Sequence, residues 1–344
     1  MLICFLVFFV QYYGKLKVID LSNSKDLRQT PNVSGIPNLE ELYFNDCTKL
    51  VEVHQSIRQH KKLRILSLMG CVDLKIFPKK LEMLSLKMLF LTDCSNIKRL
   101  PDFGKNMTCI TELNLLNCKN LISLPNSISN LKSLRILNIS GCSKICTLPD
   151  GINQNKALED IDLSRTAIRE LHPSLLQLEN IKRLSLRSCS GPASNLSWDF
   201  HLPFGKKFSF FSTQTANLTL PPFLSGLSSL TELDLSYCNL TDNSISHDID
   251  CLSSLERLIL SGNNFVSLPT HYLTNLSKLH YLELEDCPQL QSLPMLQPQV
   301  RLYVTDSDAR EAYALDPQKI WKLFESSDKK LLPSSLYHVC TSTN

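Results

Sequence analysis

Apolar side chains recur along this chain in one repeated order, with a step of 23 to 25 residues between most copies. The clearest copy contains Ile110, Leu113, Leu115, Cys118, Leu121, Leu124, Pro125, Ile128 and Leu131. Counted from the first apolar position, the copies begin at Leu16, Leu39, Leu63, Leu86, Ile110, Leu134, Leu158, Ile181, Leu230, Leu255 and Leu279. A unit of this length cannot bury its apolar residues alone, so the pattern predicts a stacked solenoid.

Each unit has two different halves. In the first half a strand would point Leu113 and Leu115 inward, while Glu112 and Asn114 point outward. In the second half a Leu-Pro pair limits regular helix and favours turns or 3-10 segments. Strands lie about 4.8 Å apart and the other side of the unit is wider, so the stack curves. The sequence therefore predicts an α/β repeat solenoid, a horseshoe with a parallel β-sheet on its concave side and turns, 3-10 segments and short helices on its convex side.

One step in the series, from Ile181 to Leu230, measures 49 residues, which is two periods. Residues 190–229 hold either an inserted domain rich in aromatic residues or a degenerate unit. The segment Leu220-Pro221-x-x-Leu224-x-x-Leu227 repeats the second half of a unit position for position, which favours the degenerate unit. That unit would begin near Lys206 with Phe211 at its second strand position, and residues 190–205 would form a bulge. We therefore expect a solenoid of about twelve units over residues 16–298.

The two ends depart from the repeat. Residues 1–15 include a run of nine apolar residues, which is too short to span a membrane, and we interpret it as a remnant strand or a leader. The leader interpretation lacks a preceding Lys or Arg and a small-x-small cleavage site. Residues 299–344 begin with a partial copy, Val300-x-Leu302-x-Val304. They continue as a truncated post-repeat region with short helices and a frayed tail.

The chain has 13 Cys, and eight of them occupy one position of the unit, three residues after the strand. Because equivalent positions stack, each of these Cys should be a small buried residue whose weak S–H donor faces the adjacent turn. A row of this kind supplies neither the pairs that disulfides need nor the tight clusters that zinc needs. Free buried thiols favour a cytoplasmic location; residues 1–13 acting as a leader would instead make the protein secreted or cell-surface. This structural ladder comprises Cys47, Cys71, Cys94, Cys118, Cys142, Cys189, Cys238 and Cys287.

Charge and motifs exclude several functional classes. The 36 Lys and Arg nearly balance the 33 Asp and Glu, giving a net charge of +3, so we expect no nucleic-acid partner. The patterns G-x-x-x-x-G-K-[ST] and G-x-S-x-G are absent from the sequence, and the eight His are scattered. We expect no catalytic residue, no cofactor, no metal and no membrane span. Seven Asn-x-Ser/Thr triplets would carry glycans only in a secreted protein.

The repeat LxxLxLxxCxxLxxLPxxI has Cys where many leucine-rich repeats have Asn. In this it resembles the repeat region of plant intracellular immune receptors that combine TIR, nucleotide-binding (NB-ARC) and leucine-rich regions. The phrases Gly35-Ile-Pro-Asn-Leu39, Leu50-Val-Glu-Val-His54 and Leu121-Ile-Ser-Leu-Pro125 carry the resemblance, which covers residues 15 to 305. In that family the repeats sense a pathogen effector or a modified host protein and hold the nucleotide-binding domain inactive. The family's TIR domain cleaves NAD, but this sequence contains neither a phosphate-binding loop nor a TIR region.

The resemblance implies a non-catalytic protein-recognition module of plant innate immunity. Its partners would be a pathogen effector, a host protein or the NB-ARC domain of a receptor. An extracellular leucine-rich-repeat receptor ectodomain and a general intracellular scaffold are the alternatives. Binding would use charged and aromatic residues near strand centres of the second half of the concave face. The candidates are Asp162, Arg165, Arg187, Asp234, Tyr237, Glu283, Glu285 and Asp286.

Overall fold

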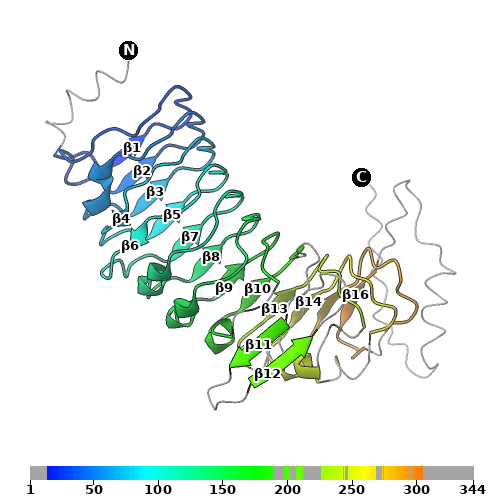
Figure 1. The fold of residues 1–344 in the computed structure, drawn as a ribbon. Coiled ribbons are helices and arrows are strands. Elements are labelled where there is room, and N and C mark those ends of the chain that lie inside the picture. The colour runs from blue at the N-terminus through cyan, green and yellow to red at the C-terminus, as the bar shows by residue number, and fades with distance from the viewer. Residues whose placement is uncertain are drawn as a thin grey trace.

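Repeated strand–turn–return units stack into a curved array in the computed structural model (Figure 1). The structure describes residues 14–304 except 170, 172, 190–196, 202–206, 212–225, 243, 245–246, 269–272, 274 and 294–295. The segments expected as an N-terminal remnant or leader and as C-terminal short helices therefore lie outside the described residues, apart from their inner ends.

Twelve short parallel strands form one sheet that runs the length of the array. Each strand has the central Leu or Ile pointing into the core, with an outward residue on either side of it, and each pairs in register with the next. The strands are β1 Val18–Asp20, β2 Glu41–Tyr43, β3 Ile65–Ser67, β5 Met88–Phe90, β7 Glu112–Asn114, β8 Ile136–Asn138, β9 Asp160–Asp162, β10 Arg183–Ser185, β13 Glu232–Asp234, β14 Arg257–Ile259, β15 Tyr281–Glu283 and β16 Arg301–Tyr303.

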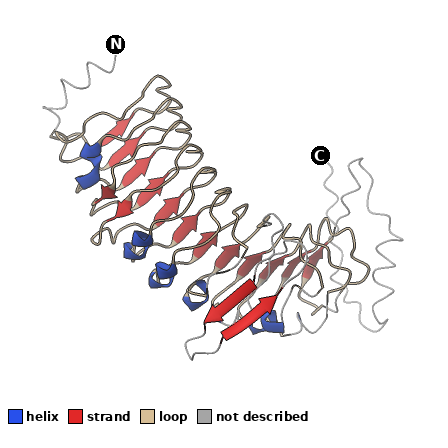
Figure 2. Ribbon diagram, viewed as in Figure 1, coloured by secondary structure: helices blue, strands red, loops and turns tan. Residues whose placement is uncertain are grey.

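The return halves of the units lie along the other side of the array (Figure 2). Here Pro125 and Pro149 immediately precede 3-10 segments, because a fixed proline φ suits the entry to a tight helical turn. The described 3-10 segments are η2 Gln55–Gln59, η3 Asn126–Asn130, η4 Asp150–Gln154, η5 Leu175–Gln177 and η7 His247–Cys251. Two short strands, β4 Lys80–Leu81 and β6 Asp102–Phe103, pair in parallel on the return side. The predicted solenoid, with a parallel sheet on one side and turns and 3-10 segments on the other, is confirmed.

The expected degenerate unit in residues 190–229 is wrong in its strand half. Strand β10 pairs directly with β13, so no strand from this segment enters the main sheet. Instead β11 Ser197–His201 and β12 Lys207–Phe211 form a separate antiparallel pair. The sequence gives the reason, because a unit starting at Lys206 would place polar Ser209 at the inward position that Leu or Ile fills elsewhere. The twelfth strand of the sheet is β16, from the partial copy near Val300.

The core is a continuous stack of aliphatic side chains, and the Cys row runs through it. Each of the eight thiols donates from Sγ to the carbonyl oxygen of the apolar residue that follows the strand of the preceding unit, over 3.0 to 3.6 Å. Asn263 replaces Cys in one unit and donates from Nδ2 to the equivalent acceptor, Leu235 O, at 3.0 Å. Burial raises the pKa of the Cys71 and Cys238 thiols to about 12. These thiols are therefore uncharged hydrogen-bond donors that tie each unit to the one before it.

Ion pairs join neighbouring units through residues that lie just before the strands. Glu159 accepts hydrogen bonds from Arg135 of the unit before it and from Lys182 of the unit after it. The Arg135 guanidinium, followed by Lys182, lowers the pKa of Glu159 to about 2. Glu40 has the same arrangement, with Lys17 at 2.7 Å and Arg64 at 3.7 Å.

Candidate protein-binding face

The outward side of the sheet is the accessible face on which a partner could be recognised. Because all strands pair in register, outward residues of successive units form straight columns, with about 4.8 Å between neighbours. Of the predicted site residues, Asp162, Asp234 and Glu283 lie on strands in one such column. Sequence reasoning placed the whole set near strand centres, and for the other five this is wrong.

The other five candidates lie in the turn that follows the strand. Arg165, Tyr237 and Asp286 directly precede the ladder position and have φ values of 55°, 57° and 54°. This position has positive φ throughout the series, and Asp, Asn or Gly fills it in most units. A bulky Tyr is unusual in this backbone conformation, which indicates that contacts made by its side chain hold it there. Arg187 and Glu285 lie one residue earlier.

Three candidates meet in one cluster. The Arg187 guanidinium lies over the Tyr237 ring, with 5.0 Å between Cζ and the ring centroid. The Tyr237 hydroxyl donates to Asp286 Oδ2 at 2.5 Å, although the two residues are 49 positions apart. This hydrogen bond to Asp286 raises the pKa of Tyr237, so the phenol stays protonated. Tyr237 is 37% exposed, which leaves part of its ring open to a partner.

Gly262 makes this cluster possible. It occupies the turn position of the unit between those of Tyr237 and Asp286, and the Tyr237 ring lies across it. A Cβ at Gly262 would overlap Cδ1 and Cε1 of that ring. The missing side chain therefore lets one Tyr reach across a whole repeat.

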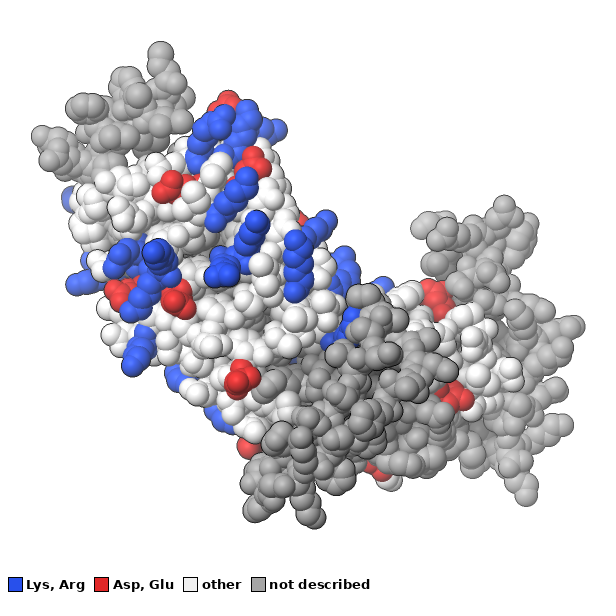
Figure 3. Space-filling model, viewed as in Figure 1, with Lys and Arg blue, Asp and Glu red and all other residues white. Residues whose placement is uncertain are grey.

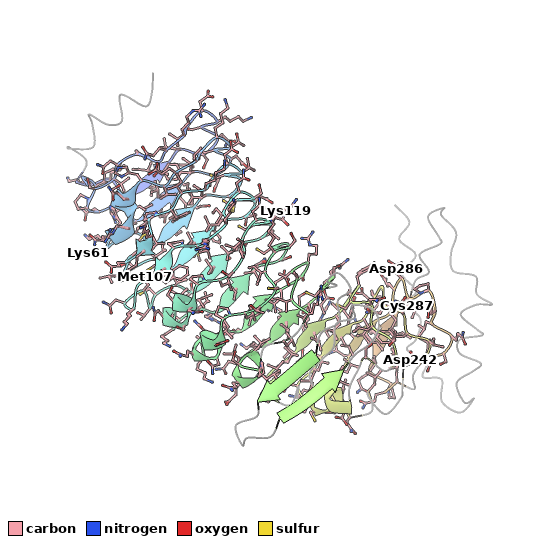
Figure 4. All side chains as sticks on the ribbon, in the orientation of Figure 1. Lys61, Met107, Lys119, Asp242, Asp286 and Cys287 are labelled. Carbon is pink, nitrogen blue, oxygen red and sulfur yellow. The ribbon has the colours of Figure 1, made fainter. Side chains whose placement is uncertain are left out.

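Acidic side chains surround the far end of the cluster. Burial, together with Glu283 and Asp286, raises the pKa of Glu285. Glu283 accepts hydrogen bonds from Ser261 Oγ at 2.8 Å and from Tyr281 Oη at 2.7 Å. Asp286 lies near the C-terminal end of the described array, next to Cys287 (Figure 4).

The remaining candidates are not part of this cluster. Asp162 accepts a hydrogen bond from the Ser164 amide at 2.9 Å, and Asp234 accepts one from the Ser236 amide at 2.9 Å. Serine hydroxyls link the strand ends that carry Asp162 and Asp234. Ser164 Oγ lies 2.7 Å from Ser185 Oγ, and Ser185 Oγ lies 3.4 Å from Asp234 Oδ2. Arg165 is exposed two units before the unit of Tyr237.

Sequence reasoning missed a second aromatic group on the same face. Arg257 Cζ lies 4.1 Å from the Tyr281 ring centroid, and the Tyr281 and Tyr303 centroids are 4.6 Å apart. The signal was available, because Arg257, Tyr281 and Arg301 precede the central Leu of consecutive strands. A column of outward residues read across units, rather than along one unit, would have found it.

Charge divides the array into two halves. Residues 14–157 contain 21 Lys and Arg and 12 Asp and Glu, whereas residues 158–304 contain 10 and 15. Basic side chains accordingly gather over the N-terminal half in the space-filling view (Figure 3). Within the described residues there is no group of His, Cys, Asp and Glu that could hold a metal ion. No described helix is long and apolar enough to cross a membrane.

These features define the class of protein. The profile of the Leucine Rich Repeat family matches residues 229–252. A leucine-rich-repeat protein of Leptospira interrogans has the same fold, with a TM-score of 0.50 at 22% identity over 91% of this chain and 77% of that one. The structure of the Drosophila Toll–Spatzle complex contains a chain that matches with a TM-score of 0.63 at 16% identity, over 87% of this chain and 38% of that one. The chain has the leucine-rich-repeat solenoid fold.

Curated proteins with higher sequence identity to parts of this chain are plant disease resistance proteins. TMV resistance protein N of Nicotiana glutinosa is 48% identical over 80 residues, covering 23% of this chain and 7% of that protein. Disease resistance-like protein DSC1 of Arabidopsis thaliana is 37% identical over 151 residues, covering 44% of this chain and 10% of that protein. The repeats are related to the leucine-rich-repeat region of plant TIR-NB-LRR disease resistance proteins. The match spans a tenth or less of these relatives' own length.

Proposed function

We propose that this chain recognises a protein partner in plant innate immunity, either a pathogen effector or a host protein. We further propose that it thereby regulates a nucleotide-binding immune receptor. Its relationship to disease resistance proteins supports the biological setting. The Arg187–Tyr237–Asp286 cluster carries the proposal of recognition, because a partly exposed Tyr held in place by neighbours loses little freedom on binding. Tyr and Arg are also the residue types that contribute most at protein interfaces.

The proposed location is the cytoplasm. The Cys row supports it, because eight reduced thiols at one repeated position are compatible with a reducing compartment. A secreted protein would instead receive glycans at its Asn-x-Ser/Thr triplets. Treatment of the protein from leaf tissue with an endoglycosidase separates the two locations. We expect no mobility shift, and a shift would contradict the cytoplasmic proposal.

The test of recognition is quantitative co-precipitation of the tagged full chain from leaf tissue. Tyr237→Ala and Arg187→Ala should each reduce recovery of the true partner about tenfold, the loss expected for an interface anchor of at least 1.4 kcal/mol. Lys105→Ala is the matched control, because Lys105 is exposed on the return side of the array. Tyr237→Phe keeps the ring and should reduce recovery less than Tyr237→Ala.

Recovery of every co-precipitating protein unchanged by both alanine variants would reject the proposed face. The immune role is read separately, by asking whether a nucleotide-binding receptor is among the proteins recovered. Its presence with wild type and with Lys105→Ala supports regulation, whereas its absence from all samples contradicts it.

A further inference from the structure

The N-terminal half of the concave face carries a second surface of different chemistry. Strands β3, β5, β7 and β8 are consecutive in the sheet. On and just after them, six apolar side chains remain half-buried or exposed on the outward side. Met69 and Ile136 are each 37% exposed. We call this group the apolar patch, and its members are Ile65, Met69, Met88, Phe90, Leu116 and Ile136.

The fold does not require these residues to be apolar. Phe90 pairs in register with Asn114, which pairs with Asn138, so the same repeat position accepts an amide in two neighbouring units. Ile136 pairs with Asp160, so its position accepts a carboxylate one unit later. Adjacent apolar side chains on an accessible sheet face, at positions where polar ones fit, indicate a binding surface.

Basic residues border the apolar patch at both ends of its strands. Residues 61–119 contain 11 Lys and Arg and five Asp and Glu. Arg64, Lys87 and Arg135 directly precede the strands, and Lys119 lies in the turn after β7. Asp93, in the turn after β5, accepts a hydrogen bond from Asn117 Nδ2 at 2.9 Å. In the stick view Lys119 lies on the edge of the array opposite to Lys61 (Figure 4). Among the described residues Lys87 and Lys119 have no ion-pair partner, so their charges are available to a ligand.

One acidic group lies inside the patch. Glu112 pairs in register with Met88 on one side and Ile136 on the other. Burial, with a smaller contribution from Asp160, raises the pKa of its carboxyl group. A ligand carboxylate would be repelled at this point and attracted at Lys87 and Lys119. The charge pattern therefore favours acids that flank an apolar centre.

We propose that the apolar patch docks a protein segment that presents aliphatic or aromatic side chains flanked by Asp and Glu. This inference rests on the proposed role in protein recognition but uses residues distinct from the Arg187–Tyr237–Asp286 cluster. A protein segment fits better than nucleic acid, because Phe90 alone offers a ring for stacking, whereas single-stranded nucleic acid uses several. Three strand spacings of about 4.8 Å give a patch roughly 15 Å long across the strands, and the basic residues lie at right angles to this length, at the two ends of the strands.

The test is selection of a displayed library of random peptides, about twelve residues long to include both flanks, on the full chain. Enriched peptides should combine Leu, Ile, Met or Phe with flanking Asp and Glu. Binding of one enriched peptide should weaken about tenfold in Phe90→Asn/Ile136→Asn, a loss of about 1.4 kcal/mol. It should also lose much of its salt dependence in Lys87→Thr/Lys119→Ser. Asn114, Thr111 and Ser95 stand at the repeat positions of Phe90, Lys87 and Lys119. The position of Ile136 holds a carboxylate in both neighbouring units, so it also accepts a polar residue and we expect folding to be preserved.

Three further binding measurements test the proposed docking patch. Glu112→Gln should bind the acidic peptide more tightly, since it removes the only carboxylate within the patch. Tyr237→Ala should leave peptide binding unchanged, which separates this surface from the proposed cluster. Enrichment of basic peptides, competition by a single-stranded RNA oligonucleotide, or binding insensitive to Phe90→Asn/Ile136→Asn would each overturn the proposal. Failure here, together with partner loss in Tyr237→Ala, would reject the patch and leave the proposed function standing.

Discussion

Replacing Gly262 with Ala tests the link between the fold and the Tyr237 cluster. Gly262 has a φ of +68°, in the left-handed region that an alanine side chain disfavours. The added Cβ would also overlap the Tyr237 ring, which lies across this glycine on its way to Asp286. The ring would therefore have to leave its place, and both of its interactions would be lost.

The two effects are separable in size. A left-handed φ costs an L-residue about 1 to 2 kcal/mol. Loss of the exposed stacking between Arg187 and Tyr237 costs about 0.5 to 1 kcal/mol, and loss of the hydrogen bond to Asp286 about 1 kcal/mol. We therefore expect Gly262→Ala to lower the free energy of unfolding by about 2.5 to 4 kcal/mol.

Gly141→Ala is the matched control. Gly141 has a φ of +74° at the equivalent turn position, and its added Cβ would meet Oδ1 at the end of the Asn117 side chain, which can rotate, and would lie 3.3 Å from the Asn117 Cα. It should therefore lose mainly the backbone contribution. Guanidinium unfolding followed by circular dichroism measures both variants, and hydrogen exchange at the Gly262 amide, which donates to Glu285 O at 2.8 Å, reports the local loss. Equal destabilisation of the two variants would refute the bridging role of Tyr237.

Three other predictions concern the stack itself. Cys142→Ala, which removes a fully buried thiol and its bond to Leu115 O, should cost about 1 to 2 kcal/mol in denaturant unfolding, and Cys142→Ser should cost less. With its folded pKa of about 2 below its ordinary 4.5, Glu159 stabilises the fold above pH 4.5, and that contribution is lost as pH falls toward 2. Glu159→Gln should therefore show a flatter fall in unfolding midpoint over that range, and an unchanged profile would contradict the ion-pair account. Among the described cysteines, a thiol reagent should label the exposed Cys109, Cys146 and Cys251 in the native protein, and the seven buried ladder thiols only after unfolding; Cys287 of the ladder is half-buried.

Much of the fold follows from the sequence because one physical demand repeats in each unit. Each unit must place an inward Leu or Ile at the centre of its strand. The constant spacing between Leu113, Leu137 and Ile161 therefore sets which strands pair and in what register. The same regularity misled at residues 190–229. There the return half copies the repeat, but the strand half offers polar Ser209 where an apolar side chain is needed, and β10 pairs with β13 instead.

The candidate site was less predictable from the sequence, because it depends on side-chain contacts between different units rather than on the order of residues within one unit. The Tyr237–Asp286 contact skips an entire repeat, and it exists only because the residue between them is Gly262. Likewise Met88 and Phe90 stand in the apolar run 88–91, and Ile136 directly precedes the apolar Leu137, so alternation does not reveal which side chains face outward. The register of the sheet settles that question, since each lies beside the inward Leu of its strand.

Stability and recognition use different residues of the same strand, and this division explains how one scaffold carries two unlike surfaces. The inward residues Leu89, Leu137 and Leu233 are of one type and fully or almost fully buried, because each layer must match the next. The outward residues beside them, Phe90, Asn138 and Asp234, differ freely in size and charge because solvent, not the core, faces them. We therefore expect outward substitutions to change which partner binds, with little effect on folding. An apolar surface bordered by basic residues and an aromatic cluster with acidic neighbours can thus coexist along one sheet.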